Sequence, residues 1–154
     1  MNYAEWEASV PASIQGDPLW RTEVDRLALF AADIGWHDVT ALAADRRTLS
    51  LADQLYRALG SIGANIAEGY SRGTGPDRAR FYEYALGSAR ESRDWYYKAR
   101  HVLKESLVEH RLDLLTQIIR LLMVMVPHQR GRAMREQQGE YNTPPDALPP
   151  LADV

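Results

Sequence analysis

The stretch SIGANIAEGYSRG, residues Ser61 to Gly73, places polar and small residues inside an otherwise regular helical pattern. On a helix, residues three and four apart lie on one side, so Ser61, Asn65 and Glu68 form a polar ridge beside the apolar ridge that contains Ile66. Buried polar groups need hydrogen-bond partners, and an unpaired buried carboxylate is costly. The ridge therefore predicts a polar joint with a facing helix. The alternative for the same residues is a ligand or partner site.

The facing helix is expected to be the one that follows this motif. The run RGTGPDR, residues 72–78, supplies two glycines for a turn, a first-turn proline and an acid suited to the positive start of a helix. The middle of the next helix, GSARES at 87–92, is built mainly from small residues, which let two helices approach closely. The candidate partners of Asn65 and Glu68 are Ser88, Glu91, Ser92, Arg93 and Arg72.

Apolar residues recur every three or four positions along most of the chain, and no segment alternates with the period of a strand. Helices are predicted over residues 17–35, 50–69, 76–103 and from about 106, with a short helix over 38–46. Short connections between long helices are typical of antiparallel neighbours. The sequence therefore predicts an all-α protein, an antiparallel up-down-up-down four-helix bundle with an extra short helix between helices one and two.

The last helix carries two adjacent apolar stripes, one from Val108 to Val126 and one from Leu114 to Met125. A bundle helix ordinarily buries one stripe about 100° wide. We therefore expect this helix either to lie centrally or to meet another subunit. Pro127 lacks a backbone donor and is predicted to kink or end the helix.

The predicted domain organisation has three parts. Residues 1–16 form an N-terminal extension, residues 17–139 form the bundle, and residues 140–154 form a tail that is rich in proline. Four prolines and no helical period in the last fourteen residues predict that the tail is disordered.

Composition narrows the class of protein. A chain of 154 residues, 45% of them hydrophobic, is the size of one domain. The absence of cysteine excludes disulfides, thiolate zinc sites and a cysteine nucleophile, and it fits a reducing compartment. The first residues carry acids and no apolar run, and the most apolar window, 112–126, is too short and too polar to span a bilayer. A soluble, cytoplasmic protein without membrane contact is expected.

Charge is unevenly distributed along the chain, whose net charge is −3. Residues 70–135 carry 13 Lys and Arg against 7 Asp and Glu, and the segments on either side are acidic. A basic middle attracts an anionic partner, although a solvated surface of mixed charge explains the same counts.

The basic segment also contains three consecutive aromatic residues, Trp95 to Tyr97. Rings interleaved with cations can stack bases and neutralise phosphates. The candidate nucleic-acid contacts are Arg90, Arg93, Lys98, Arg100 and Lys104. The alternative is that Trp95 and Tyr96 belong to the core or to an interface, and that the cations form ion pairs along the helix, such as Asp94 with Lys98.

No residue pattern in the chain points to catalysis. No histidine has a glutamate three residues before it, which excludes the usual di-metal site of a helical bundle. Gly73 and Gly75 lack the preceding strand and the following Gly-Lys-Ser/Thr of a phosphate loop. We expect no enzyme activity, no cofactor, no metal and no small-molecule substrate.

Two motifs resemble a known family. SIGANIAEGYSRG and ALGSARES are similar to the Ser-Ile-Pro-x-Asn-Ile-Ala-Glu-Gly and Ala-Leu-Gly-Ser-x-x-Glu motifs of small bacterial four-helix bundle proteins that include the 23S rRNA intervening-sequence proteins. The resemblance covers residues 18–126. By motif match, the family-signature residues are Ser61, Asn65, Glu68, Gly69, Ser88 and Glu91.

The resemblance implies a bundle that assembles into a ring, typically a pentamer, without a cofactor. The same fold is used by the accessory variability protein of diversity-generating retroelements, which is basic and works with a reverse transcriptase and nucleic acid. We therefore expect a non-enzymatic, homo-oligomeric and pentameric scaffold, associated with structured RNA or DNA or with a reverse transcriptase. The alternative is a protein–protein interaction adaptor with no nucleic-acid contact.

Overall fold

A computed structural model of the chain describes residues 2–131, and every regular element in that range is helical. The elements are α1 (Tyr3–Ser9), α2 (Ala12–Gln15), the 3₁₀ helix η1 (Pro18–Arg21), α3 (Glu23–Ala43), α4 (Leu49–Tyr70), α5 (Gly75–Ala99) and α6 (Glu105–Arg130). The prediction of an all-α protein is confirmed for the described residues. None of these helices combines the length and the apolarity that a bilayer span requires.

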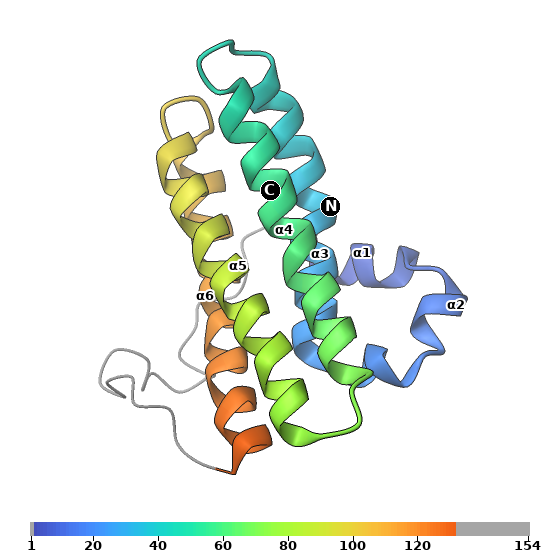
Figure 1. Ribbon diagram of the computed structural model, residues 1–154. Helices are drawn as coiled ribbons and strands as arrows, with labels where there is room; N and C mark the ends of the chain where they lie inside the picture. Colours follow the sequence, from blue (N-terminus) through green and yellow to red (C-terminus); the bar gives the residue numbers. More distant parts are fainter. Residues whose placement is uncertain (1, 132–154) are drawn as a thin grey trace.

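The four long helices, α3 to α6, pack side by side as a bundle (Figure 1). Helix α4 packs against α3 and α5, and α6 packs against α5 and α3. The α3–α4 and α5–α6 connections lie at one end of the bundle and the α4–α5 connection lies at the other (Figure 1). Apolar side chains from all four helices, such as Phe30, Ile62, Leu86 and Ile118, fill the space between them.

The first long helix differs from the prediction at both ends. Residues 18–21 form the separate 3₁₀ helix η1, and α3 runs without a break from Glu23 to Ala43. The predicted short helix over 38–46 is therefore wrong, because residues 38–43 continue α3. Gly35 lies inside α3 and does not end it. It allows α3 to approach α4 closely, because a Cβ added there would lie 2.4 Å from Leu59 Cδ1.

The connection between α4 and α5 follows the sequence pattern closely. Helix α4 ends at Tyr70 and α5 begins at Gly75, with Pro76 in its first turn. The Thr74 hydroxyl accepts a hydrogen bond from the Asp77 backbone N–H at 3.4 Å, so Thr74 caps the helix. The turn that the glycines and the proline predict is confirmed.

Helix α6 buries most of both apolar stripes within this one chain. Leu114, Leu115, Ile118 and Ile119 are all buried, so the double stripe reflects contact with more than one neighbouring helix. Pro127 does not end the helix, which continues to Arg130. An ion pair of 2.7 Å between Arg130 and Glu83 of α5 holds the turn that follows the proline. Gly131 then ends α6 with a left-handed φ of 68°, a conformation that favours glycine.

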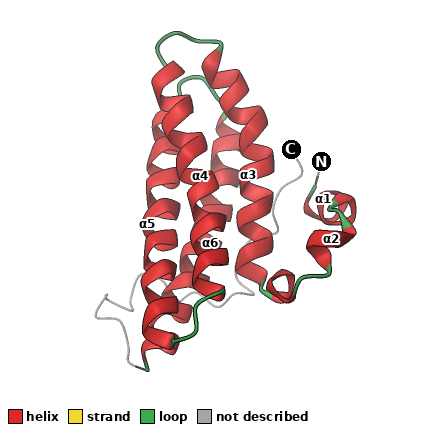
Figure 2. Cartoon of the chain, turned by 45° about the vertical axis from the view of Figure 1, so that its right-hand side comes forward, coloured by secondary structure: helices red, strands yellow, loops and turns green. Residues whose placement is uncertain are grey.

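The N-terminal residues fold back against the bundle (Figure 2). Trp6 of α1 is buried, and its ring lies 5.2 Å from the ring of Phe30 of α3. The Trp6 indole N–H donates to an Asp33 carboxylate oxygen at 2.6 Å. Part of the segment predicted as an extension thus contributes to the core. Residues 132–139 of the predicted bundle and the predicted tail, 140–154, lie outside the described residues.

Candidate functional site

At the predicted joint, a hydrogen bond between two serines crosses from α5 to α4, and the contacts of Asn65 stay within α4. The Ser88 hydroxyl of α5 donates to the Ser61 hydroxyl oxygen of α4 at 3.0 Å. The Asn65 amide donates to the Ser61 hydroxyl at 3.0 Å and to the Ser61 carbonyl at 2.9 Å, within its own helix. These three side chains are half-buried, so the joint is a small neutral network at the edge of the helix pair.

Glycine allows the same two helices to come close one turn further along. Gly69 is buried, and a Cβ added there would lie 2.8 Å from the Tyr82 ring and 3.0 Å from Phe81 Cβ. This is closer than an alanine side chain tolerates without a shift of the neighbours. Gly69 therefore joins α4 to α5 by steric fit, while Ser61 and Ser88 join them by hydrogen bonding.

The two predicted carboxylates do not enter the joint. Glu68 is exposed and pairs with Arg72, which follows the end of α4 and is among the predicted partners. Glu91 is exposed and accepts a hydrogen bond of 3.2 Å from the Trp95 indole on its own helix. The polar ridge therefore runs along the outer side of the contact between α4 and α5, where its carboxylates reach solvent.

The five candidate nucleic-acid contacts do not form one continuous row. Arg90 and Arg93 contact α6: Arg90 Nη2 lies 3.8 Å from the Met123 sulfur, and Arg93 Nη1 lies 3.5 Å from the Thr116 hydroxyl. Lys98 pairs with Asp94 at 2.5 Å. This pair is the one that the helix spacing predicts.

The remaining cations lie near the end of α5. The Arg100 guanidinium lies 4.0 Å from the centroid of the Tyr97 ring, and Lys98 lies 4.6 Å from that of Trp95. Lys104 is exposed at the start of α6. Of the predicted rings, Tyr96 belongs to the core, Trp95 is half-buried and Tyr97 is exposed.

A buried charged cluster links α3, α5 and α6, and no local motif in the sequence predicts it. An Asp38 carboxylate oxygen accepts a hydrogen bond from the Tyr96 hydroxyl at 2.7 Å and one from Arg111 Nε at 2.7 Å. The other oxygen accepts from Arg111 Nη2 at 3.2 Å. Arg111 Nη1 lies 2.8 Å from His110 Nδ1, so this histidine nitrogen acts as the acceptor.

The buried charges of this cluster neutralise each other. Asp38, Tyr96, His110 and Arg111 are all buried, and the charges of Asp38 and Arg111 balance. Burial, and next the Asp38 charge, raise the pKa of Tyr96 well above its usual value, so the phenol stays protonated as a donor. Burial, and next the Arg111 charge, lower the pKa of His110. The arrangement stabilises the packing of three helices and offers no free nucleophile.

One signal in the sequence points to this cluster in retrospect. Asp38 stands one turn after Ile34 and one turn before Leu42, and both of these are buried. Arg111 likewise stands between Val108 and Leu115 on the buried side of α6. A lone charge within an apolar stripe requires a buried partner, but the sequence does not show which residue that partner is.

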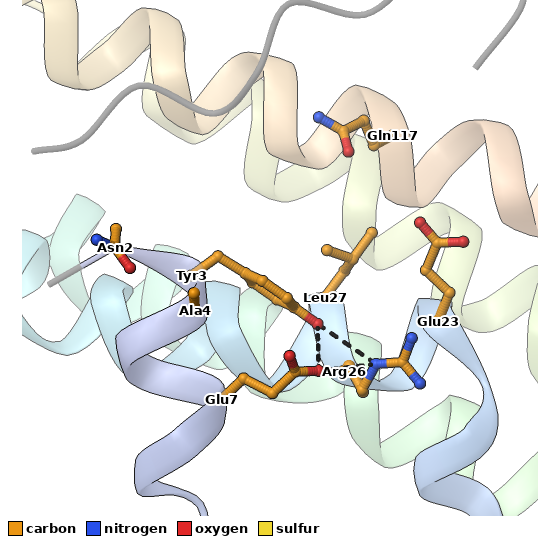
Figure 3. A pocket seen from close by; sticks show the side chains of 8 residues that line it. All are labelled: Asn2, Tyr3, Ala4, Glu7, Glu23, Arg26, Leu27 and Gln117. Atoms are coloured by element: carbon orange, nitrogen blue, oxygen red, sulfur yellow. Dashed lines mark hydrogen bonds and ion pairs between the residues drawn. The ribbon is translucent and has the colours of Figure 1, made fainter. Parts of the chain in front are cut away.

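A hollow of about 590 Å³ lies between α1, α3 and α6 (Figure 3). Its lining consists of Asn2, Tyr3, Ala4, Glu7, Glu23, Arg26, Leu27 and Gln117. Figure 3 shows Asn2 and Tyr3 on one side of the hollow and Glu23 and Arg26 on the other. The sequence does not predict this hollow, because α1, which forms one of its walls, lies in the segment predicted as an N-terminal extension.

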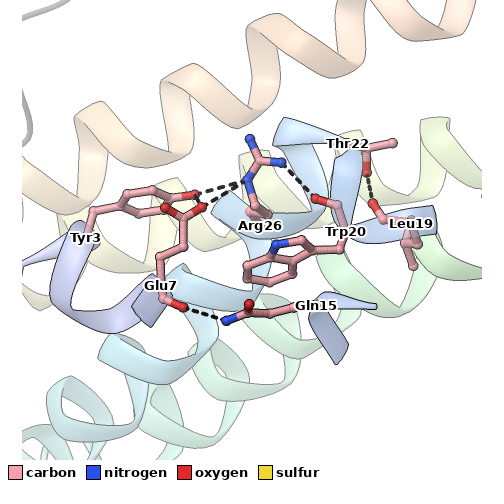
Figure 4. Close-up of polar contacts among 7 residues, drawn as sticks. All are labelled: Tyr3, Glu7, Gln15, Leu19, Trp20, Thr22 and Arg26. Carbon is pink, nitrogen blue, oxygen red and sulfur yellow. Dashed lines mark hydrogen bonds and ion pairs between the residues drawn. The ribbon is translucent and has the colours of Figure 1, made fainter. Parts of the chain in front are cut away.

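Two charged side chains of the lining, Glu7 and Arg26, pair with each other (Figure 4). Glu7 accepts from the Tyr3 hydroxyl at 3.3 Å and lies 3.4 Å from Arg26 Nε. Arg26 Nη1 donates to the Trp20 carbonyl at 2.7 Å. Burial raises the pKa of Tyr3. These contacts fasten α1 and η1 to α3. Across residues 2–131, no three His, Asp or Glu side chains gather as metal ligands would.

The comparison with known families agrees with this architecture. The model of the 23S rRNA-intervening sequence protein family matches residues 29–124, which is more than half of the chain. The matched range contains the whole α4–α5 joint and the buried cluster. Neither a curated protein sequence nor a solved structure matches the chain. Because the match runs from α3 into α6, the chain belongs to the 23S rRNA-intervening sequence protein family.

Proposed function

We propose that the protein is a non-enzymatic scaffold of the cytoplasm, an antiparallel up-down-up-down four-helix bundle that assembles with copies of itself into a pentameric ring. The ring associates with a nucleoprotein complex, either through structured RNA or DNA or through a reverse transcriptase. The family match supports the link to ribosomal RNA only through the name of the family. The observation that carries the proposal is the distribution of exposed apolar side chains.

Large apolar side chains are exposed on two different edges of the bundle. On the α3–α4 edge, Trp36 is 57% exposed and its ring lies 5.6 Å from that of Tyr56. On the α5–α6 edge, Tyr97 is 54% exposed and Val124 is 70% exposed. Since α3 and α5 both neighbour α4 and α6, these two edges lie on opposite sides. A ring of identical subunits needs two such different surfaces, one for each neighbour.

Two glycines add to this support. Gly60 of α4 and Gly87 of α5 are exposed in mid-helix, and a Cβ added at either would have nothing within 4 Å. A glycine in a helix interior costs roughly 0.5–1 kcal/mol relative to alanine. Packing within residues 2–131 therefore does not explain them. Close approach by a helix of another subunit would explain both.

Light scattering on the full chain at micromolar concentration tests the assembly. We expect a mass of five times the 17.4 kDa of one chain. The substitutions Trp36→Asp and Val124→Asp should each reduce this mass, because a charge replaces an exposed apolar contact. Ile14→Asp is the matched control, since Ile14 is an exposed apolar residue on α2, away from both edges. A 17.4 kDa monomer would contradict the proposal.

Titration with structured RNA and duplex DNA at several salt concentrations tests the nucleoprotein association. Binding through phosphate contacts must weaken steeply as salt rises. The acidic net charge of −3 makes low salt the decisive condition. If the assembled protein binds neither nucleic acid at low salt, the adaptor that contacts only proteins replaces this part of the proposal.

A further inference from the structure

The hollow between α1, α3 and α6 has the size of a peptide-binding site. Its volume of about 590 Å³ lies within the range of about 300–1,000 Å³ that is typical of sites for a drug-sized ligand. Leu27, which is buried, supplies an apolar part of the lining, and the half-buried Tyr3 ring lies near it (Figure 3). A hollow of this size and lining accommodates a few residues of an extended peptide.

Two polar side chains of the lining lack partners in the described part of the chain. The Gln117 amide and the Glu23 carboxylate form no hydrogen bond and no ion pair within residues 2–131. The amide has two N–H donors, which fit the carbonyl oxygens of a peptide backbone, and the carboxylate fits a cation. The hollow therefore offers an apolar surface, amide donors and one carboxylate to an incoming segment.

The rest of the chain leaves the bundle within reach of this hollow. Helix α6, which contributes Gln117, ends at Arg130, and α3 begins at the same end of the bundle (Figure 1). Gln117 stands thirteen residues before Arg130, which is about 20 Å along the helix. The eleven residues from 132 to 142 span at most about 40 Å when extended. Residues from Tyr141 onward can therefore reach the hollow.

The composition of that segment matches the lining. Residues 140–151 contain four prolines, two leucines and Tyr141. Proline-rich segments favour the polyproline II conformation, which has no internal hydrogen bonds and leaves its carbonyl oxygens to accept from donors such as the Gln117 amide. Prolines in this conformation dock on aromatic side chains, and Tyr3 is the aromatic residue of the lining.

Charge favours the same segment. Arg132 and Arg135 are the only Lys or Arg residues after Gly131 in the sequence. Glu23 begins α3 at the end of the bundle where α6 finishes. Cations that follow α6 therefore start close to a carboxylate of the lining, and their attraction to it directs the chain toward α3 and the hollow.

We propose that residues 140–151 bind in this hollow of their own chain as an extended, proline-rich segment. The proline rings lie against Tyr3 and Leu27, and backbone carbonyl oxygens accept from the Gln117 amide. The bound segment holds α1 against the bundle from outside. It leaves the α3–α4 and α5–α6 edges free, so the inference stands apart from the proposed ring and from nucleic-acid binding.

Disulfide mapping tests this placement, because the chain has no cysteine of its own. Gln117→Cys is combined in the full chain with one further cysteine at each position from 141 to 151 in turn, for example Ala147→Cys, and each variant is mildly oxidised. A disulfide requires Cα atoms about 4.4–6.8 Å apart. We expect an intrachain disulfide, located by mass spectrometry of linked peptides, to form about tenfold faster at one or two neighbouring positions than at the others.

Gln54→Cys is the matched control. Gln54 is an exposed glutamine of α4, sixteen residues before Tyr70, where α4 reaches the end of the bundle at which α6 also ends. Because Gln54 does not line the hollow, its disulfides with the same positions should form slowly and without a preferred position. Replacement of Pro144 and Pro145 by glycine should abolish the preference for Gln117→Cys and leave the Gln54→Cys profile unchanged. Thermal unfolding under reducing conditions checks that each variant keeps its fold.

Three results would overturn the inference. Equal, flat profiles with Gln117→Cys and Gln54→Cys would show that residues 140–151 have no preferred contact with the hollow. A preferred position with Gln54→Cys alone would place the segment on α4. Disulfides between two chains, seen as a doubled mass on a non-reducing gel, would assign the hollow to the segment of a second copy. Light scattering on the unmodified chain decides the ring separately in each case.

Discussion

The joint between α4 and α5 and the charged cluster between α3, α5 and α6 hold the same bundle together by different means. The joint uses the neutral, half-buried groups of Ser61, Asn65 and Ser88. The cluster uses the buried charges of Asp38 and Arg111, each with a further buried partner. The joint lies within the conspicuous sequence motif, whereas no motif marks the cluster.

This difference shows what a motif of small and polar residues encodes in a helical bundle. Ser61, Gly69 and Ser88 permit close approach of the two helices. Such a contact between small neutral side chains buries no charge. A buried ion pair is different, because loss of one partner leaves an uncompensated charge. The most conspicuous motif should therefore be the more tolerant of the two regions to substitution. The following predictions test this order.

Arg111→Ala should have the largest effect. Removal of the guanidinium leaves the Asp38 carboxylate buried, with only the Tyr96 hydroxyl as partner, and breaking a buried pair costs about 3–5 kcal/mol. The free energy of unfolding, measured by urea denaturation, should fall by this amount. Arg57→Ala, which breaks the exposed pair with Asp53, should cost less than about 1 kcal/mol. Equal effects of the two substitutions would show that burial of the Asp38–Arg111 pair does not increase the cost of breaking it.

Gly69→Ala should have the next largest effect. The new methyl group would lie 2.8 Å from the Tyr82 ring, which is itself buried, and overpacking of this kind costs roughly 1–3 kcal/mol. Gly63→Ala, in the same helix, is the matched control, because the added methyl group would meet only Ala28 Cβ, at an ordinary contact distance of 3.8 Å. It should leave the chain's thermal unfolding temperature unchanged or raise it. A tolerated Gly69→Ala would show that α4 and α5 can separate freely.

Asn65→Ala should have a smaller effect. It removes two hydrogen bonds to Ser61 from a half-buried site, and a typical hydrogen bond contributes about 0.5–1.5 kcal/mol. Denaturation should detect a loss in that range. Glu68→Ala removes only an exposed pair with Arg72 and should fall within about 0.5 kcal/mol of the original chain. Unchanged stability in both variants, together with failure to bind a partner, would assign Asn65 to a binding site.

The pH dependence of His110 should be the smallest effect. Burial and the Arg111 charge lower its pKa in the folded state, against the opposing influence of Asp113 and Asp38. The folded state therefore binds this proton less readily than the unfolded state. The contribution to stability is fully present above the unfolded pKa of about 6.5 and is lost as pH falls through the lower folded pKa.

Thermal unfolding between pH 7.5 and about pH 5 measures this contribution. His110→Gln keeps an acceptor for Arg111 without titrating, so its unfolding temperature should fall less on acidification than that of the original chain. The comparison cancels other groups, such as Asp25, whose pKa burial raises to about 6. His101→Gln, at an exposed position, is the control and should behave like the original chain. A parallel fall in all three chains would exclude His110 as the cause.

The parts of the fold that local chemistry decides could be predicted from the sequence. The turn between α4 and α5 follows from its glycines and Pro76, and the ion pair of Lys98 with Asp94 follows from helical spacing. Gly35 was misleading because a glycine either ends a helix or permits a close approach, and only the position of Leu59 decides which. Glu68 was expected in the joint, and the structure places it at the surface.

The buried cluster could not be predicted, since Asp38 lies 58 residues from Tyr96 and 73 from Arg111 along the chain. Each of these residues is locally an isolated exception in an apolar stripe. Only the packing of three helices brings them together.

The position of Trp6 decides where a stable fragment of this protein can begin. The family match begins at residue 29, but the Trp6 ring packs on Phe30 and its indole binds Asp33, both of which lie inside the match. A fragment cut at the limits of the match would expose Phe30 to water and leave Asp33 without its donor. The smallest fragment suitable for expression and crystallisation therefore begins at the N-terminal helix, ahead of the residues that the family model matches.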